Sequence, residues 1–255
     1  MARVKNKMLY IYKKNALCDV DSLRQAAGIL DADHPVVSVT GAGGKTSSIR
    51  RLTGEYIRSG QKVIVMTTTH LMVEEEPWFL LEPSEEKMRE LLETYSQVWV
   101  GTPAENRRMG PVPDEFLNVI WNMELPVLVE ADGARQLPLK VPGEQEPVIL
   151  PQTTHLLSVY GLDGIGGRIR DVFFRPERAA ELLGRQPEDL VTVEDVALLA
   201  SSEDAGRKGC PADAVYTVVL NKADTLRLKA RALEISRELE KAGIMRIAVS
   251  SREED

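Results

Sequence analysis

The chain is poor in the residues that build disulfide frameworks and metal centres. Its 255 residues include only two cysteines, Cys18 and Cys210, and three histidines. Two cysteines this far apart in the sequence have no metal-ligand spacing, and a disulfide scaffold needs more of them. We therefore expect neither a structural zinc site nor a fold held together by disulfides.

The chain also lacks an excess of positive charge and a long apolar run. Its net charge is -7, whereas proteins that hold nucleic acid through phosphate contacts are usually basic. No apolar segment long enough for a signal peptide or a membrane span follows the N-terminal basic cluster. We expect a cytoplasmic protein that binds neither nucleic acid nor membranes. The basic cluster consists of Arg3, Lys5, Lys7, Lys13 and Lys14.

The hydrophobic content of 43% is enough for one large core. Short apolar runs alternate with amphipathic segments, which predicts a three-layer α/β/α sandwich with a mainly parallel sheet, similar to P-loop NTPases. We expect residues 35–255 to form this domain. Residues 1–34 are predicted to be a helical extension, because Val20, Leu23, Ala27 and Leu30 recur at helical spacing.

The predicted elements follow this alternation along the whole chain. Strands are expected at 36–39, 63–66, 98–100, 127–129, 156–160, 215–220 and 247–249. Helices are expected at 45–59, 74–95, 114–123, 177–183, 193–200 and 226–242. Proline and glycine predict loops at 102–114, 137–151 and 206–211.

The stretch 36–50, VVSVTGAGGKTSSIR, has the pattern of a phosphate-binding loop between a strand and a helix. Glycines let backbone amides wrap an anion, and the helix adds its positive end. Lys45 would contact the outer phosphates and take part in catalysis, and Thr46 would bind Mg²⁺. We expect the nucleotide to contact Gly41, Ala42, Gly43, Gly44, Lys45, Thr46 and Ser47.

This loop departs from the standard pattern, because Val39 stands where the first glycine is expected. The remaining T-G-x-G-G-K-T resembles the loop of the Mur ligases and of some related ATP-binding proteins. A glycine turn without a ligand is the alternative.

Polar residues also follow the strand at 63–66, namely Thr67, Thr68, Thr69 and His70. Ligands of open α/β sheets bind at the carboxyl ends of the strands. We expect Thr67 to bind Mg²⁺, Thr68 and Thr69 to contact the nucleotide, and His70 to act in catalysis. Ordinary capping of a strand end is the alternative.

Two carboxylates, Glu130 and Asp132, close the strand at 127–129. A carboxylate beside a phosphate loop can hold Mg²⁺ or orient an attacking water. The form E-x-x-G is found at this element in several GTPases that service metal enzymes. We expect both residues to be catalytic and to bind the metal, and an acidic turn is the alternative.

The tetrapeptide Asn221-Lys222-Ala223-Asp224 follows the strand at 215–220. N-K-x-D after a strand is the guanine-reading element of GTPases, because its aspartate accepts two hydrogen bonds that adenine cannot supply. Asn221 would brace the phosphate loop and the stem of Lys222 would cover the base. The residues Ser250 and Ser251 follow the last strand, where GTPases contact guanine. GTP is therefore favoured over ATP, and a helix cap is the alternative.

The ordered set TGAGGKT, VMTTTH, VEADGARQLPLKVP, EPVILP, GLDGIGG, FRPE and LNKAD resembles the selenium cofactor biosynthesis family of the YqeC type. The resemblance covers about residues 38–224. It implies a nucleotide-binding accessory protein of selenium-dependent molybdenum hydroxylases, with the hydroxylase or its cofactor-maturation proteins as partners. Cys210 is a poor selenium carrier, because no activating base stands beside it in the sequence.

These observations predict an accessory protein that binds GTP or ATP with Mg²⁺ and hydrolyses it. Two other functions stay open. The Mur-like loop also suits an ATP-dependent ligase or phosphotransferase acting on a small acid, which would turn over only with an acceptor. A nucleotide-gated chaperone would show negligible turnover, and its partner binding would survive the loss of Glu130 and Asp132.

Overall fold

The structure is a computed structural model that describes residues 9–251, so Arg3, Lys5 and Lys7 of the basic cluster lie outside the described residues. The strands of its main sheet are β1 (Leu9–Lys13), β2 (Ala16–Asp19), β3 (Val36–Gly41), β4 (Val63–Thr67), β6 (Phe79–Leu80), β7 (Gln97–Val100), β10 (Val127–Glu130), β12 (His155–Gly161), β14 (Val215–Asn221) and β15 (Ile247–Ser250). The helices are α1 (Leu23–Ala27), α2 (Lys45–Arg58), α3 (Glu85–Tyr95), α4 (Asp114–Trp121), α5 (Ile169–Val172), α6 (Pro176–Leu183), α7 (Val193–Ser201) and α8 (Leu226–Lys241), with a 3₁₀ turn at Leu162–Gly164. Two small sheets contain β5 (Leu71–Met72), β8 (Thr102–Ala104) and β9 (Arg108–Gly110), and β11 (Leu139–Lys140) with β13 (Phe173–Phe174).

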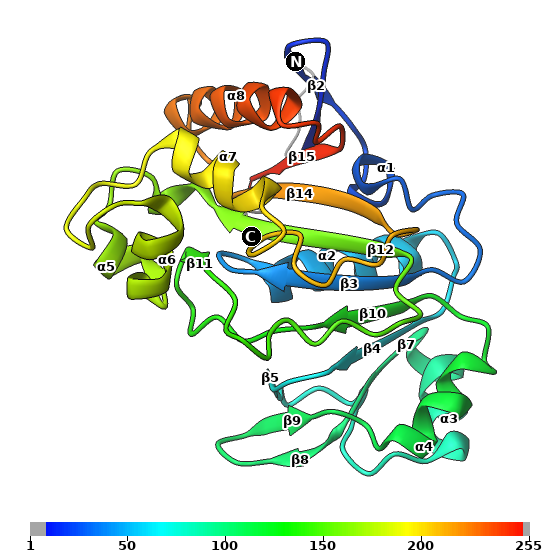
Figure 1. The fold of residues 1–255 in the computed structure, drawn as a ribbon. Coiled ribbons are helices and arrows are strands. Elements are labelled where there is room, and N and C mark those ends of the chain that lie inside the picture. The colour runs from blue at the N-terminus through cyan, green and yellow to red at the C-terminus, as the bar shows by residue number, and fades with distance from the viewer. Residues whose placement is uncertain (1–8, 252–255) are drawn as a thin grey trace.

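The main sheet has the strand order β2-β1-β15-β14-β12-β3-β10-β4-β7-β6 (Figure 1). Neighbouring strands from β15 to β6 are all parallel, and only the pairs that β1 makes with β15 and β2 are antiparallel. Parallel strands need crossover connections, which helices supply in most cases, whereas the proline-rich segment connects β10 to β12. The phosphate-loop strand β3 therefore lies in the middle of the sheet.

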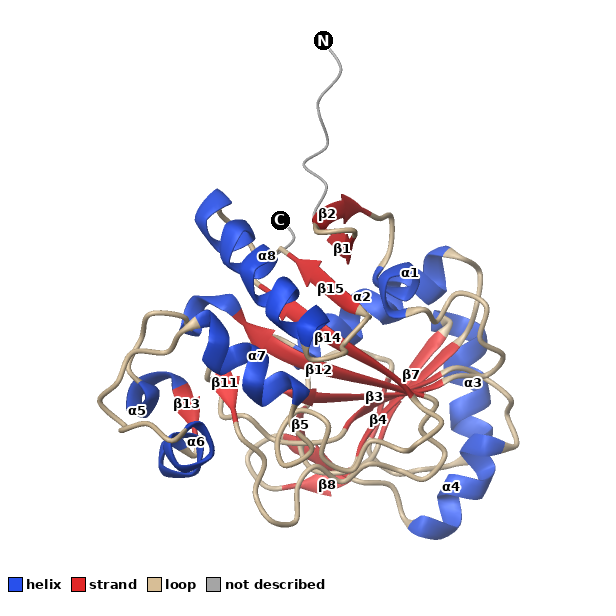
Figure 2. Ribbon diagram, turned by 45° about the horizontal axis from the view of Figure 1, so that its top comes forward, coloured by secondary structure: helices blue, strands red, loops and turns tan. Residues whose placement is uncertain are grey.

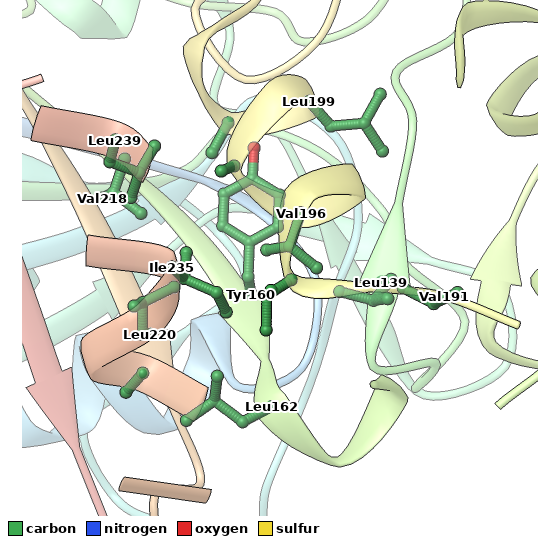
Figure 3. Close-up of a cluster of buried hydrophobic side chains, with 14 of the residues drawn as sticks. Leu139, Tyr160, Leu162, Val191, Val196, Leu199, Val218, Leu220, Ile235 and Leu239 are labelled. Atoms are coloured by element: carbon green, nitrogen blue, oxygen red, sulfur yellow. The ribbon is translucent and has the colours of Figure 1, made fainter. Parts of the chain in front are cut away.

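Side chains that alternate along the strands fill hydrophobic cores on both faces of the sheet, in three clusters. Val39 and Val159 pack with α1 and α2 on one face. On the other face, Tyr160 packs between Val196 of α7 and Ile235 of α8 (Figure 3). Figure 2 shows α7 and α8 on the side of the sheet opposite α2. The predicted three-layer α/β/α sandwich with a mainly parallel sheet is confirmed.

The N-terminal segment differs from the predicted helical extension. The hairpin of β1 and β2 extends the main sheet through β15, and its helix is limited to α1. Ser22 caps the start of α1 by accepting from the Gln25 amide, and Gly28 ends it at φ +74°. The helix predicted from Val20, Leu23, Ala27 and Leu30 is present as α1, but the hairpin before it was not predicted. The partner of β1 is β15, at the other end of the described chain, which no local pattern reveals.

Three other predicted boundaries also need correction. Residues 74–95 are not one helix, since α3 begins at Glu85 and Pro77 and Pro83 interrupt the segment before it. The predicted loop at 102–114 contains the hairpin of β8 and β9. The proline-rich segment 137–151 contains the short strand β11. No helix of the described residues is both long and apolar enough to cross a membrane.

The central sheet can be tested by removing one buried side chain from it. Leu128 on β10 has 0% of its surface exposed, and Leu226 at the start of α8 has 86% exposed. We expect Leu128→Ala to lower the free energy of unfolding by about 2–5 kcal/mol. The matched change Leu226→Ala should stay within about 0.5 kcal/mol. Equilibrium urea unfolding measures both, and equal effects would contradict a core position for β10.

Candidate functional site

The loops that carry the predicted site residues all leave the same edge of the main sheet. Strands β10, β3, β12, β14 and β15 are adjacent and parallel, so their carboxyl ends meet there (Figure 1). The phosphate loop follows β3, Asp132 lies just beyond β10, and Asn221 ends β14. The fold thus gathers residues that are up to about 180 positions apart, as the hydrogen bond from Asn221 to Gly43 demonstrates.

The phosphate loop requires glycine because it runs against the backbone of neighbouring segments. Gly41 has φ +89°, and a Cβ atom there would lie 2.3 Å from the carbonyl oxygen of Val159. A Cβ atom on Gly43 would lie 2.4 Å from the amide nitrogen of Gly161 and 2.6 Å from the carbonyl oxygen of Pro138. The glycines therefore let the loop pack tightly between β12 and the proline-rich segment.

Three amides of the loop donate hydrogen bonds within the protein. The amides that a helix N-terminus leaves without an intrahelical partner are those of the first turn of α2. An anion would thus bind at Gly44 to Ser47, a shorter segment than the predicted Gly41 to Ser47. The Gly41 amide donates to the Asp132 carboxylate (3.0 Å), the Ala42 amide to the Val159 carbonyl (2.9 Å) and the Gly43 amide to the Leu137 carbonyl (3.1 Å). The first helical hydrogen bond runs from the Ser48 amide to the Gly44 carbonyl (2.9 Å).

Buried charges tie this loop to the proline-rich segment. Asp132 lies between two ammonium groups, with one carboxylate oxygen 3.0 Å from Lys45 Nζ and the other 2.9 Å from Lys140 Nζ. Lys140 also pairs with Glu146 (2.7 Å), which pairs with Arg175 (2.9 Å). Burial alone would raise the pKa of Glu146, but the hydrogen bonds from Arg175 and Lys140 lower it below its ordinary value. The five residues form a continuous chain of alternating charge, in which each buried charge has a partner.

Within this series of paired charges Asp132 joins the phosphate loop to the proline-rich segment, a structural role that the sequence did not indicate. Both its oxygens contact lysine ammonium groups, and one also accepts from the Gly41 amide. The carboxylate is therefore engaged by two buried lysines and by the phosphate loop. Lys140, which lies in the predicted loop at 137–151, reaches it from the proline-rich segment. No local signal reveals this contact, because it depends on how that segment folds back over β10.

Glu130 and Thr46 form the pair that suits Mg²⁺. The Thr46 hydroxyl donates to a carboxylate oxygen of Glu130 at 2.8 Å. Burial raises the pKa of Glu130, while the nearby Lys45 charge and the Thr46 bond lower it, and the net shift is upward. Mg²⁺ prefers oxygen ligands and in nucleotide sites takes one or two from the protein, with phosphate oxygens and water completing the shell. Among residues 9–251 no group of three or more histidine, cysteine or acidic side chains could hold a metal ion.

The segment after β4 divides into a structural part and a part that faces a cavity. The buried Thr67 hydroxyl donates to the Glu130 carbonyl (2.9 Å) and accepts from the Thr69 amide (3.0 Å). Thr68 donates to the carbonyl of Val148 (2.7 Å). Thr69 and the exposed His70 line a cavity, whereas Thr67 and Thr68 do not. The geometry thus favours Thr69 and His70 over Thr67 and Thr68 as ligand contacts.

Asn221 joins the predicted base-reading element to the phosphate loop. Its side-chain amide donates to the carbonyl of Gly43 (2.8 Å), which is the brace that the N-K-x-D pattern predicts. Its side-chain oxygen accepts from the hydroxyl of Ser250 (2.8 Å). Lys222 is held by an ion pair with Asp163 (2.6 Å), and Asp224 lies exposed at the start of the next loop.

Two cavities meet at this edge and share Gly44, Ser47 and Lys222. The first, of about 520 Å³, also contains Thr46 and Glu130 in its lining. The second, of about 440 Å³, is lined by Asn221, Ser250 and Ser251 among others, while Asp224 is not part of its lining. Both volumes are in the range of small-molecule sites. One ligand could therefore lie across the phosphate loop with an end in each cavity.

The buried charge chain can be tested at its centre. We expect Asp132→Ala to lower the free energy of unfolding by about 3–5 kcal/mol, because it leaves two buried ammonium groups without their shared carboxylate. Glu75→Ala breaks the exposed ion pair with Arg107 and should cost at most about 1 kcal/mol. Urea unfolding compares the two variants. If Asp132→Ala lowers the free energy of unfolding no more than Glu75→Ala does, the chain of charges does not stabilise the fold.

Comparison with known proteins places the chain in a family. The model of the YqeC protein family matches residues 37–177, more than half of the chain. The uncharacterised protein YqeC of Escherichia coli strain K12 is 29% identical over 182 residues, which cover 69% of this chain and 71% of the relative. The family match includes the phosphate loop, Glu130, Asp132 and the proline-rich segment. The chain therefore belongs to the YqeC family.

Proposed function

We propose that this protein binds a nucleoside triphosphate with Mg²⁺, GTP in preference to ATP, and hydrolyses it. The observation that supports this best is the bond from the Asn221 side chain to the carbonyl of Gly43, at 2.8 Å. It holds the end of β14 against the phosphate loop, so that one bound molecule can contact both. The Ser250 hydroxyl, bonded to the same side chain, adds the end of β15 to this group.

In this proposal the triphosphate lies on the first turn of α2, over the amides of Lys45, Thr46 and Ser47. The positive end of a 14-residue helix favours the phosphate charge. The base and ribose occupy the second cavity, where Asn221, Ser250 and Ser251 lie. Asp224, an exposed residue three positions after Asn221, would read the guanine edge.

Thr46 and Glu130 would hold Mg²⁺, which when bound neutralises charge on the phosphates during their hydrolysis. Their 2.8 Å hydrogen bond keeps the hydroxyl and the carboxylate adjacent. Lys45, held by Asp132, places its ammonium group beside the loop. His70 and Thr69 line the first cavity, where the outer phosphate would point, and can orient a water there.

We extend the proposal to the maturation of selenium-dependent molybdenum hydroxylases, which the family resemblance implies. The surroundings of Cys210 argue against a role as selenium carrier and favour a contribution through nucleotide use. The thiol of Cys210 contacts the carbonyl of Pro211 at 3.6 Å, and burial raises its pKa. A raised pKa lowers the fraction of reactive thiolate. The residue also lies outside the lining of both cavities.

The choice of base is tested by calorimetric titration with GTP, ATP and their diphosphates in the presence of Mg²⁺. We expect GTP to bind more tightly than ATP. Asp224→Asn should lower the affinity for GTP by about tenfold or more, because a hydrogen bond to a charged group contributes about 1.5–3 kcal/mol. ATP affinity should not change.

Asp213→Asn is the matched control, since Asp213 is an exposed aspartate that precedes the opposite end of β14. It should leave both affinities unchanged. Equal losses for GTP and ATP in Asp224→Asn would assign Asp224 to the protein's structure, and a wild-type preference for ATP would favour the ligase or phosphotransferase function.

Glu130→Gln separates metal-dependent hydrolysis from binding. Glutamine can still accept the Thr46 hydrogen bond but carries no charge for the metal. We expect GTP hydrolysis with Mg²⁺ to fall by about 10² or more, the usual effect of losing a positioned catalytic group. Because ionised Glu130 is destabilised by burial, the free energy of unfolding at neutral pH should not fall. Unchanged turnover would remove Glu130 from the site.

A further inference from the structure

The first cavity extends from the phosphate loop to a wall that carries two arginines. We propose that this wall binds the phosphate or carboxylate group of a second, small-molecule substrate, an inference that rests on the assignment of the phosphate loop to a nucleotide. The arginine wall consists of Met72 on β5, Arg108 on β9, Arg135, and Phe174 on β13.

The two guanidinium groups of the wall have no acidic partner. Among residues 9–251 neither Arg108 nor Arg135 forms an ion pair with a carboxylate. The adjacent Arg107 does form one, with Glu75, and does not line the cavity. Cations without partners that face a cavity favour an anion, and the planar guanidinium matches phosphate and carboxylate oxygens in pairs.

Arg135 lies over an aromatic ring that also contacts Arg175, the last member of the buried charge chain. Its guanidinium carbon lies 5.1 Å from the ring centre of Phe174, and that of Arg175 lies 4.3 Å from the same ring. Arg175 is in turn paired with Glu146 at 2.9 Å. A guanidinium group that lies over a ring keeps its N–H edge for a ligand.

The backbone at Arg135 forms a turn beside the first cavity. Arg135 and Gln136 have φ values of +45° and +61°, in the left-handed region that non-glycine residues seldom adopt. The Leu137 amide donates to the Ala134 carbonyl (3.1 Å), which closes this turn. Both Arg135 and Gln136 line the first cavity.

The wall lies in a different part of the site from the proposed base. The base is assigned to the second cavity, which shares with the first only Gly44, Ser47 and Lys222. With the phosphates on α2, the first cavity keeps its Arg108 and Arg135 side beyond the outer phosphate. Its volume of about 520 Å³ is sufficient for an additional small molecule. A nucleotide and a second, anionic small molecule could thus be bound together.

The test uses inorganic phosphate as the probe and protein saturated with Mg²⁺ and a non-hydrolysable GTP analogue. Calorimetry should detect one phosphate site. Arg108→Ala and Arg135→Ala should each lower the affinity for phosphate by about tenfold, as expected for the loss of a charge-assisted hydrogen bond. Arg107→Ala, the neighbouring control, should leave the phosphate affinity unchanged. All three variants should bind the GTP analogue as the wild type does.

Three results would overturn the proposal. Absence of phosphate binding to the saturated wild type is the first. An equal loss in Arg107→Ala would mean that surface charge alone attracts the ion. Weaker binding of the GTP analogue in Arg108→Ala and Arg135→Ala, without a phosphate site, would assign the wall to the nucleotide. A parallel titration with acetate shows whether the tighter ligand group is a phosphate or a carboxylate.

Failure of the proposed nucleotide function would be visible separately, as no binding of the GTP analogue to the wild type. Phosphate is then titrated into the nucleotide-free protein, and Arg108→Ala is compared with Arg107→Ala. If only Arg108→Ala loses phosphate affinity, the proposed anion site stands. If the two variants have the same phosphate affinity, the anion site is overturned.

Discussion

The site depends on one buried carboxylate, Asp132, which lies between the ammonium groups of Lys45 and Lys140. Charges this deeply buried are tolerated only with close partners, since each loses its hydration. The pairing brings three segments together, namely the start of α2, the end of β10 and the proline-rich segment. Lys140 also pairs with Glu146 and Glu146 with Arg175, whose guanidinium group lies over the ring of Phe174.

The parallel sheet places these segments so that their polar groups can meet. Adjacent parallel strands end at one edge, and there the phosphate loop contacts the end of β14 through Asn221 and the end of β10 through Asp132. The two cavities that result lie on either side of Gly44 and Ser47. A nucleotide bound across the loop as we propose would place its base in the second cavity and its phosphates on the first turn of α2. The arginine wall of the first cavity would then remain for another ligand.

Much of the fold could be predicted because its signals are local. The apolar runs around Val37, Leu128 and Val219 mark buried parallel strands, and Gly41 to Thr46 mark the loop. The bond from Asn221 to the phosphate loop could be predicted because N-K-x-D follows a strand in a known geometry. The hairpin of β1 and β2 could not, since its pairing with β15 joins the two ends of the described chain.

The sequence by itself determined the class of fold, the positions of the loops at strand ends and the residue types that suit a nucleotide. Only the tertiary structure decided which of those residues face a cavity. Asp132 and Thr67 are bound internally, whereas Thr46, Glu130 and His70 line a cavity. Likewise, only the fold distinguishes Arg108 from its paired neighbour Arg107. The physical reason is that a side chain's role depends on its partners in space, and these come from distant segments.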